Sequence, residues 1–244
     1  PISSDFLMAL ALWGGYRAGA YWGGQWGVGR VVWRGGRPPD ELHLHSHILG
    51  VIPGKDAQGL GFELKQHQRR WCLERDISVI EWTTDPLVRR NAYFNLTKLG
   101  ADAPQYLVNF YGEMADGINA GEESDRLLIR WHLASPQAEA AATGGAPRAE
   151  AADRIAASAD PVLAVGPEGE PMSRPASQAR FLKCEVPDDI VALRRTDPQL
   201  ARRWRLALRA ALAPALAGGL AIRGATRSGW YVLGAERALE TGRP

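Results

Sequence analysis

The chain has 244 residues, of which 45% are hydrophobic and 23% charged, and its 29 Lys and Arg residues against 27 Asp and Glu give a net charge of +2. This composition is typical of folded domains and excludes collagen-like, wholly disordered and disulfide-scaffold proteins. The small net charge gives no support for a nucleic-acid partner, and no apolar run approaches the length that spans a bilayer. We therefore expect neither nucleic acid nor a membrane as a partner.

The cysteines and the first residues indicate a compartment. Cys72 and Cys184 lie far apart in the sequence and form no CxxC pair, which fits a reducing environment and offers no zinc site. The stretch from Pro1 to Asp5 has no basic region and no cleavage pattern of a signal peptide. These features predict a cytoplasmic protein.

Residues 1–135 alternate between helix-like and strand-like patterns. In chain order we expect a helix at 3–12, strands at 16–22, 25–33 and 42–51, a helix from about 59 to 75, a strand at 77–83, a helix at 87–99, and strands at 106–111 and 127–133. In the helix from about 59 to 75, the spacing of Leu60, Leu64, His67 and Trp71 predicts the face that packs on the core.

The rest of the chain divides at residue 181. Residues 136–180 are rich in Ala, Pro and Ser and predict a linker, partly disordered, with one hairpin arm at 162–165. Residues 181–244 predict a small α+β extension docked on the first domain, with a strand at 181–186, a helix at 198–217 and strands at 221–224 and 230–233. The apolar stripe of Leu200, Trp204, Leu208 and Leu212 is too large to leave in water.

Basic side chains gather on that C-terminal helix. Arg202, Arg203, Arg205 and Arg209 fall in a stretch that contains no acid. Two interpretations stay open: a solvated helix face, or an anion site for the phosphates of a cofactor.

Several motifs together point to one family. They are Ser46-His47, Gly50-Val51-Ile52-Pro53, Gln58-Gly59-Leu60-Gly61-Phe62, Trp82-Thr83-Thr84-Asp85-Pro86-Leu87, and the Asn-rich segment from Arg90 to Gly100. With the order of the elements, they resemble the GNAT acyltransferases, and more narrowly the GNAT acetyltransferases of unknown substrate. The resemblance implies an α/β (α+β) fold with a mixed, mostly antiparallel sheet flanked by helices. It also implies that residues 1–135 lack the first strand and helix of that fold.

The resemblance implies that acetyl-CoA or another acyl-CoA lies across the turn at 51–62. Glycines let backbone N–H groups converge on an anion, and the helix that begins near Gly59 directs its positive end there. The cofactor-binding residues expected on this basis are Leu49, Val51, Gln58, Gly59, Leu60, Gly61, Phe62 and Asn91. The alternative for the glycines is close helix–sheet packing, and for Asn91 it is tethering of a loop.

The sequence departs from the family pattern at three positions. Asp56 and Ala57 stand where the family has Gln or Arg and then glycine, and Leu96 stands where many members have the tyrosine that protonates the departing thiolate. Tyr111 and Tyr93 supply the same chemistry at other positions. A packing role is the alternative for both tyrosines.

Two residues are candidates for the base that deprotonates an amine. Glu81 lies within an apolar strand, where desolvation raises the pKa of a carboxyl, and its alternative is an ion pair with an arginine. His47 precedes the cofactor turn, and its alternative is a hydrogen bond within the sheet. His43, His45 and His47 share a strand face, but neighbouring positions on one strand rarely converge on a metal, so we expect none.

These features predict an acyl-CoA-dependent N-acyltransferase that acts on a small-molecule amine, with Glu81, His47 and Tyr111 as catalytic candidates. The alternative is a GNAT-fold protein with a degenerate CoA site that binds a metabolite or catalyses a CoA-independent biosynthetic reaction. A homodimer is a further possibility that the sequence leaves undecided. The sequence does not define the acceptor or the acyl length.

Overall fold

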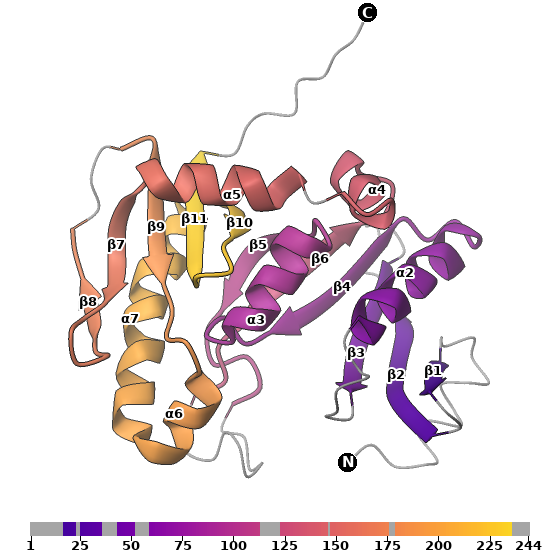
Figure 1. Ribbon diagram of the computed structural model, residues 1–244, viewed down its shortest axis with the longest axis horizontal. Helices are drawn as coiled ribbons and strands as arrows, with labels where there is room; N and C mark the ends of the chain where they lie inside the picture. Colours follow the sequence, from indigo (N-terminus) through magenta and orange to yellow (C-terminus); the bar gives the residue numbers. More distant parts are fainter. Residues whose placement is uncertain are drawn as a thin grey trace, which may run out of the picture. The chain divides into compact units, whose positions relative to one another are not determined.

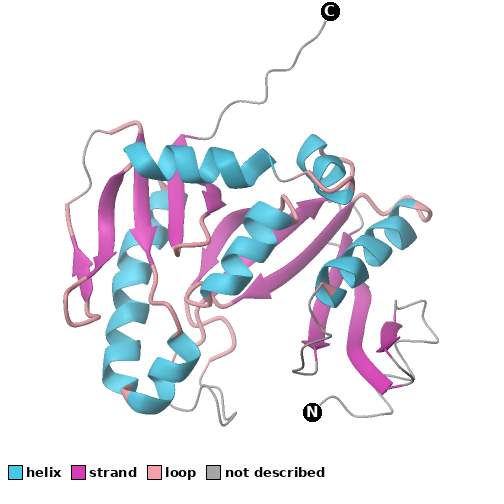
Figure 2. Ribbon diagram, viewed as in Figure 1, coloured by secondary structure: helices cyan, strands magenta, loops and turns pink. Residues whose placement is uncertain are grey.

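The protein consists of two compact units with two β-sheets (Figures 1 and 2). The computed structural model describes residues 17–22, 25–35, 43–51, 59–112, 123–145, 147–175 and 179–235. Unit 1 comprises Pro1–Trp82 and Arg130–Ala142, and unit 2 comprises Thr83–Ile129 and Thr143–Pro244. The strand orders are β1-β2-β3-β4-β6-β5 and β10-β11-β9-β7-β8. The predicted α/β class with mostly antiparallel sheets flanked by helices is confirmed.

Unit 1 is a sheet with one long helix against it. Its elements are β1 (Arg17–Trp22), β2 (Gln25–Gly35), β3 (His43–Val51), α2 (Leu60–Leu73), α4 (Pro136–Ala142) and parts of β4 (Val79–Thr84) and β6 (Arg126–His132). Strands β1, β2 and β3 are antiparallel neighbours, whereas β3 and β4 pair in parallel across the connection through α2. A parallel pair needs such a crossover because its two strands run in the same direction.

The face of α2 that packs on the core differs from the predicted one. Leu64, Gln68 and Cys72 are buried along one stripe, while His67 is exposed. The face predicted from the sequence contained the apolar Leu60 and Trp71, and His67 lies on that same face. In the structure, Leu64 and Cys72 are buried, and the polar Gln68 is buried between them.

Unit 2 contains the second sheet and the remaining helices. Its elements are α3 (Arg89–Ala92), the π-helix η2 (Tyr93–Lys98), β5 (Asp102–Leu107), α5 (Pro147–Ser158), β7 (Asp160–Val165), β8 (Pro171–Ser173), β9 (Phe181–Glu185), α6 (Ile190–Thr196), α7 (Pro198–Ala217), β10 (Leu220–Ala225) and β11 (Trp230–Ala235). Helices α5 and α7 both contact the second sheet. The core includes Trp204 and Tyr231, both fully buried.

Helix α7 spans the predicted residues. The Asp197 carboxylate accepts a hydrogen bond from the Leu200 N–H at 2.9 Å, and proline at the first helical position needs no acceptor. Trp204, Leu208 and Leu212 are fully buried, and the Trp204 indole N–H donates to the Gly169 carbonyl at 2.9 Å. The apolar stripe therefore docks within unit 2.

The expected linker is corrected by the structure. Residues 136–180 form α4, α5 and the β7–β8 hairpin, so the boundaries expected at 135 and 181 do not separate domains. The buried residues Ala138, Ala141, Ala152 and Ala156 explain this result. Alanine favours helix and lets helices pack closely, although its small side chain gives little hydrophobic signal in a sequence.

Two further elements differ from the prediction. The strand expected at 106–111 is β5 at Asp102–Leu107, and the chain then turns, with Asn109 at φ 45°. Helix α6 was not predicted; it is short and is capped by Asp189, which accepts from two backbone N–H groups. The helix expected at 3–12 lies outside the described residues.

The basic cluster of α7 is divided between solvent and structural ion pairs. Arg202 and Arg203 are exposed. Arg205 donates to the Asp85 carboxylate at 3.0 Å, and Arg209 pairs with Asp125 at 2.7 Å and with Glu123. Two of the four arginines therefore hold carboxylates of their own chain, which explains them without a bound anion.

Candidate functional site

The first feature of the candidate site is the separation of β3 from β4 in unit 1. Their parallel pairing runs from His43 opposite Val79 to His45 opposite Glu81. Strand β3 continues from there to Val51 and stays paired on its other side with β2. Among the described residues, no strand pairs with β3 on this side beyond His45, so a ligand could bond there as an extra strand, as the resemblance implies for the pantetheine arm.

The second feature is the N-terminus of α2, which directly follows the predicted cofactor turn. Gly59 stands before the helix at φ 97°, a left-handed conformation that favours glycine, and no side chain caps the helix there. Nothing lies within 4 Å of the position that a Cβ atom would occupy on Gly61. Uncapped N–H groups at a helix N-terminus attract anions, so the residues present fit a phosphate.

Some predicted cofactor residues can be placed only partly. Gln58 lies outside the described residues, as do Asp56 and Ala57. For Leu49 and Val51 the structure gives the backbone, which belongs to β3. Leu60 and Phe62 belong to the first turn of α2, and both are half-buried.

Glu81 lies at the last residue pair before β3 and β4 separate. Arg130 donates to its Oε1 atom at 2.6 Å, and Nε2 of His43 lies 3.5 Å from its Oε2 atom. The Glu81 side chain is 12% exposed, so solvent reaches it. The ion pair is the alternative that the sequence left open for this residue, and it places a carboxylate, an imidazole and a guanidinium in one cluster.

In the same unit, the Lys65 side chain packs against the rings of two tryptophans. The Lys65 Nζ atom is 3.2 Å from the centroid of the Trp82 ring, and Trp82 meets Trp131 edge to face at 6.3 Å. The side chains of Lys65 and Trp131 are buried. The sequence analysis did not identify this arrangement, because Lys65 was not among the residues of the predicted packing face of α2.

The other catalytic candidates are in different positions. His47 lies on β3, of which the structure describes only the backbone at this residue. Tyr111 is 44% exposed in unit 2, and its hydroxyl is 2.9 Å from the Thr83 hydroxyl at the end of β4. The Arg126 guanidinium lies 5.3 Å from the Tyr111 ring centroid. An exposed tyrosine with a hydrogen-bonded hydroxyl has the chemistry of a proton donor.

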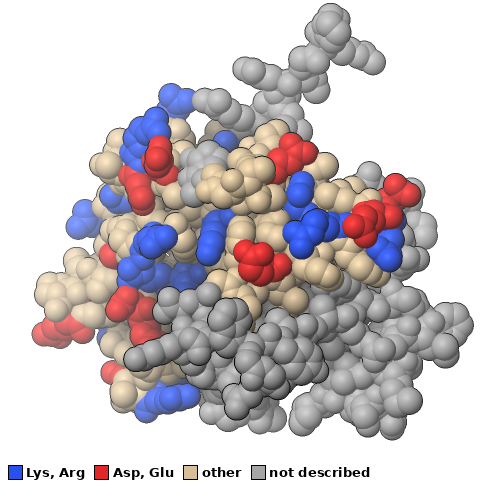
Figure 3. All heavy atoms as spheres, turned by 45° about the vertical axis from the view of Figure 1, so that its right-hand side comes forward, with Lys and Arg blue, Asp and Glu red and all other residues tan. Residues whose placement is uncertain are grey.

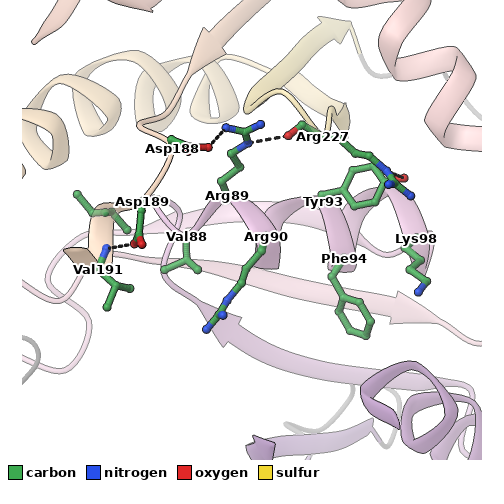
Figure 4. Close-up of a pocket in the computed structure, with 11 residues that line it drawn as sticks. Val88, Arg89, Arg90, Tyr93, Phe94, Lys98, Asp188, Asp189, Val191 and Arg227 are labelled. Carbon is green, nitrogen blue, oxygen red and sulfur yellow. Dashed lines mark hydrogen bonds and ion pairs between the residues drawn. The ribbon is translucent and has the colours of Figure 1, made fainter. Parts of the chain in front are cut away.

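Unit 2 also contains a cavity of about 710 Å³ that the sequence analysis did not identify (Figure 4). Its walls come from α3, η2, the segment 188–191 and the turn between β10 and β11. The signal that could have found it is the spacing of Arg90, Phe94 and Lys98 at every fourth residue. Asn91, the predicted cofactor residue next to Arg90, is exposed.

The described ranges between residues 17 and 235 contain neither a metal-binding cluster nor a membrane-spanning helix. Within them, no group of three His, Cys, Asp or Glu side chains is arranged to hold a metal ion. No helix within them has the length and apolar character needed to cross a bilayer.

No protein-family model and no curated protein matches the sequence. Among solved structures, the chain is similar to a GNAT family acetyltransferase from Elizabethkingia anophelis with acetyl-CoA bound, at 16% identity and a TM-score of 0.43 over 53% of this chain and 83% of the other. It is also similar to Arabidopsis thaliana Naa50 in complex with a bisubstrate analogue, at 16% identity and a TM-score of 0.42 over 53% of this chain and 80% of the other. The functional argument therefore rests on the residues of this chain.

Proposed function

We propose that this chain is a GNAT-type N-acyltransferase that uses acetyl-CoA or another acyl-CoA to acylate a small-molecule amine. The proposal rests on two structural features of unit 1: β3 separates from β4 after His45, and α2 begins at Gly59 without a side-chain cap. The turn predicted from the sequence connects them. This arrangement offers an open strand edge and the positive end of a helix in direct succession. Three of the motifs that resemble the family, Ser46-His47, Gly50 to Pro53 and Gln58 to Phe62, belong to this part of the chain.

The chain's own backbone groups supply the first part of the reaction. The N–H groups at the start of α2 bind the pyrophosphate, and the edge of β3 beyond His45 binds the extended arm. Backbone N–H groups near Leu49 to Val51 polarise the thioester carbonyl as the amine attacks. The departing thiolate takes a proton, for which Tyr111 is the proposed donor.

The amine must lose a proton before or during attack, and Glu81 or His47 accepts it. Glu81 keeps lone pairs on Oε2, since the 2.6 Å hydrogen bond from Arg130 goes to Oε1. Replacing Glu81 with Gln removes the basic group and keeps the shape, so we expect kcat to fall about 100-fold or more if Glu81 is the base. His47→Gln is the matched test of the other candidate.

Binding of the donor is tested at Gly61. Gly61→Glu places a carboxylate beside the proposed phosphate site, while Gly61→Ala adds only a methyl group where there is open space. We expect isothermal calorimetry to show acetyl-CoA binding to the parent and to Gly61→Ala, and at least a tenfold weaker affinity for Gly61→Glu. A carboxylate in the first turn of a helix does not weaken the helix, so the fold should persist. No binding to the parent at millimolar acetyl-CoA would refute the proposal.

The second candidate is a chain that has lost CoA binding and uses its cleft for a metabolite or a CoA-independent reaction. Asp56 in the turn favours it, because a carboxylate about 5 Å from a phosphate charge costs roughly 3 kcal/mol at an effective dielectric near 20, which is about a hundredfold in affinity. Asp56→Arg should then create an affinity for CoA that the parent lacks. Tight CoA binding by the parent excludes this candidate.

A further inference from the structure

The cavity of unit 2 is lined by more basic than acidic side chains. Figure 3 shows blue and red side chains intermixed over the described part of one face. The cavity, in contrast, is lined by Arg89, Arg90, Lys98 and Arg227 against the acids Asp188 and Asp189. Its volume of about 710 Å³ lies in the range of small-molecule sites.

Both acids at the cavity are already engaged. Asp188 forms an ion pair with Arg89, and Oδ1 of Asp189 accepts hydrogen bonds from the N–H groups of Val191 and Ala192 at the start of α6. The guanidinium of Arg90 has no ion-pair partner among the described residues. The lining has four cationic side chains and two carboxylates, an excess of positive charge that a bound anion would balance.

The basic and aromatic side chains are arranged on two sides of one helical segment (Figure 4). Arg90, Phe94 and Lys98 point to one side of α3 and η2, and Arg89 and Tyr93 point to the other. On that second side Arg227 donates to the Tyr93 hydroxyl at 3.1 Å and covers the ring, with its guanidinium carbon 5.1 Å from the centroid. Asp153 also attracts Arg227, so this guanidinium is partly balanced.

The segment formed by α3 and η2 has an irregular backbone, and hydrogen bonds tie it to β10 and to the turn after β10. Tyr93, Phe94 and Lys98 belong to the π-helix η2, a conformation that is rare and often marks functional sites. The Thr97 hydroxyl donates to the Ala225 carbonyl at 2.6 Å and accepts from the Ala225 N–H at 3.0 Å. The Arg89 Nε donates to the Arg227 carbonyl at 2.6 Å. The cavity walls are therefore held together by hydrogen bonds of the chain itself.

We propose that this cavity is a binding site for a phosphorylated small molecule with a planar or apolar body, separate from the acyl-CoA turn of unit 1. Arg90 and Lys98, on the same side of the segment as Phe94, supply the cations, and the Arg90 guanidinium can bind phosphate oxygens in pairs. Phe94, half-buried between Arg90 and Lys98 along the helix, supplies an apolar ring for the body of the ligand. This binding does not depend on the acyltransferase proposal.

The test uses the full chain carrying Gly61→Glu, which disables the phosphate site proposed for unit 1, with inorganic pyrophosphate and ADP as probes and citrate as the carboxylate control, measured by isothermal calorimetry. We expect both phosphate probes to bind, and Arg90→Ala to weaken each about tenfold. Phe94→Ala should weaken ADP but not pyrophosphate, because only ADP has a ring. Arg202→Ala removes an equally exposed arginine from α7 and should change neither affinity.

Several outcomes would overturn the proposal. They are the absence of pyrophosphate and ADP binding at millimolar concentration, citrate binding as tightly as pyrophosphate, and affinities that Arg90→Ala leaves unchanged. Displacement of ADP by an equimolar amount of CoA would show that the cavity belongs to the donor site. The variant Gly61→Glu separates the two proposals, because it should lose acetyl-CoA and keep ADP.

Discussion

The two units differ in how they treat buried polar groups. In unit 2 the buried Asp85 carboxylate accepts from Arg194 at 2.6 Å and from Arg205 at 3.0 Å, and the Tyr231 hydroxyl donates to the Pro86 carbonyl at 2.6 Å. The buried Asp125 accepts from the Tyr106 hydroxyl at 2.7 Å and from Arg209. These polar groups have partners, so burying them fixes a single arrangement of the elements that carry them.

Unit 1 buries polar groups that have no such partners. Among the residues the structure describes, both amide atoms of Gln68, the amide nitrogen of Gln66 and the indole nitrogen of Trp131 are buried without a hydrogen bond. An unsatisfied buried group costs about 1–3 kcal/mol. The hydrogen bonds and ion pairs named for unit 2 therefore stabilise its fold. Unit 1, which carries the proposed donor site, retains buried polar groups that lower its stability. Such departures are expected near functional sites.

Truncating the core of unit 2 should have the largest effect. Trp204→Ala removes a fully buried ring and its hydrogen bond to Gly169, so we expect the free energy of unfolding to fall by about 3–5 kcal/mol. Urea titration followed by circular dichroism measures this. A variant that unfolds at the same urea concentration as the parent would show that α7 is not docked as described.

Breaking the ion network should come next. Asp85→Asn removes the carboxylate charge that faces Arg194 and Arg205, which are 6% and 3% exposed, and we expect a loss of about 3 kcal/mol at pH 7. As a control, Glu74→Ala breaks the exposed pair with Arg75 and should change stability by less than about 0.5 kcal/mol.

The same variant tests the pH dependence. Burial by itself would raise the pKa of Asp85, but Arg205 and Arg194 outweigh it and hold the pKa below its usual range. A lowered pKa contributes stability at pH values above that of the unfolded carboxyl, about 4, and this stability is lost as the pH falls further. Thermal unfolding between pH 7 and 2 should show a smaller acid loss for Asp85→Asn. Identical slopes would contradict the assignment.

A gain in stability should come from unit 1. Gln68→Met replaces a fully buried, unsatisfied amide by an apolar chain of similar length, so we expect the free energy of unfolding to rise by about 1 kcal/mol. The exposed Gln105→Met is the matched control and should have almost no effect. Destabilisation by Gln68→Met would mean that the amide has a partner after all and would remove the contrast between the units.

The smallest effect should come from the exposed arginines of α7. Arg202→Ala combined with Arg203→Ala should leave the free energy of unfolding within about 0.5 kcal/mol of the parent, whereas Arg205→Ala should lower it by about 3 kcal/mol. If the double variant and Arg205→Ala lowered the stability equally, the difference in burial between these arginines would have no energetic consequence.

The candidate site could be predicted from the sequence only where its residues are neighbours in the chain. The strand at 42–51 and the helix after the turn follow from alternation, glycine and helical spacing, which act over a few residues. The partners of Glu81 could not be predicted, since Arg130 is 49 residues away. The same holds for the cavity of unit 2, in which Arg227 meets Tyr93 across 134 residues.

By itself the sequence determined the helix at 198–217 and the order of strands and helices from residue 17 to residue 133, and the family resemblance implied the mixed, mostly antiparallel class. Capping by Asp197, the apolar stripe and alternating strands are local signals, and each stabilises its own element wherever that element packs. The tertiary structure alone decided that Arg205 binds Asp85 across 120 residues, that the alanine-rich segment forms α4 and α5, and that Gln68 rather than His67 is buried. The physical reason is that burial and ion pairing depend on which distant surfaces meet.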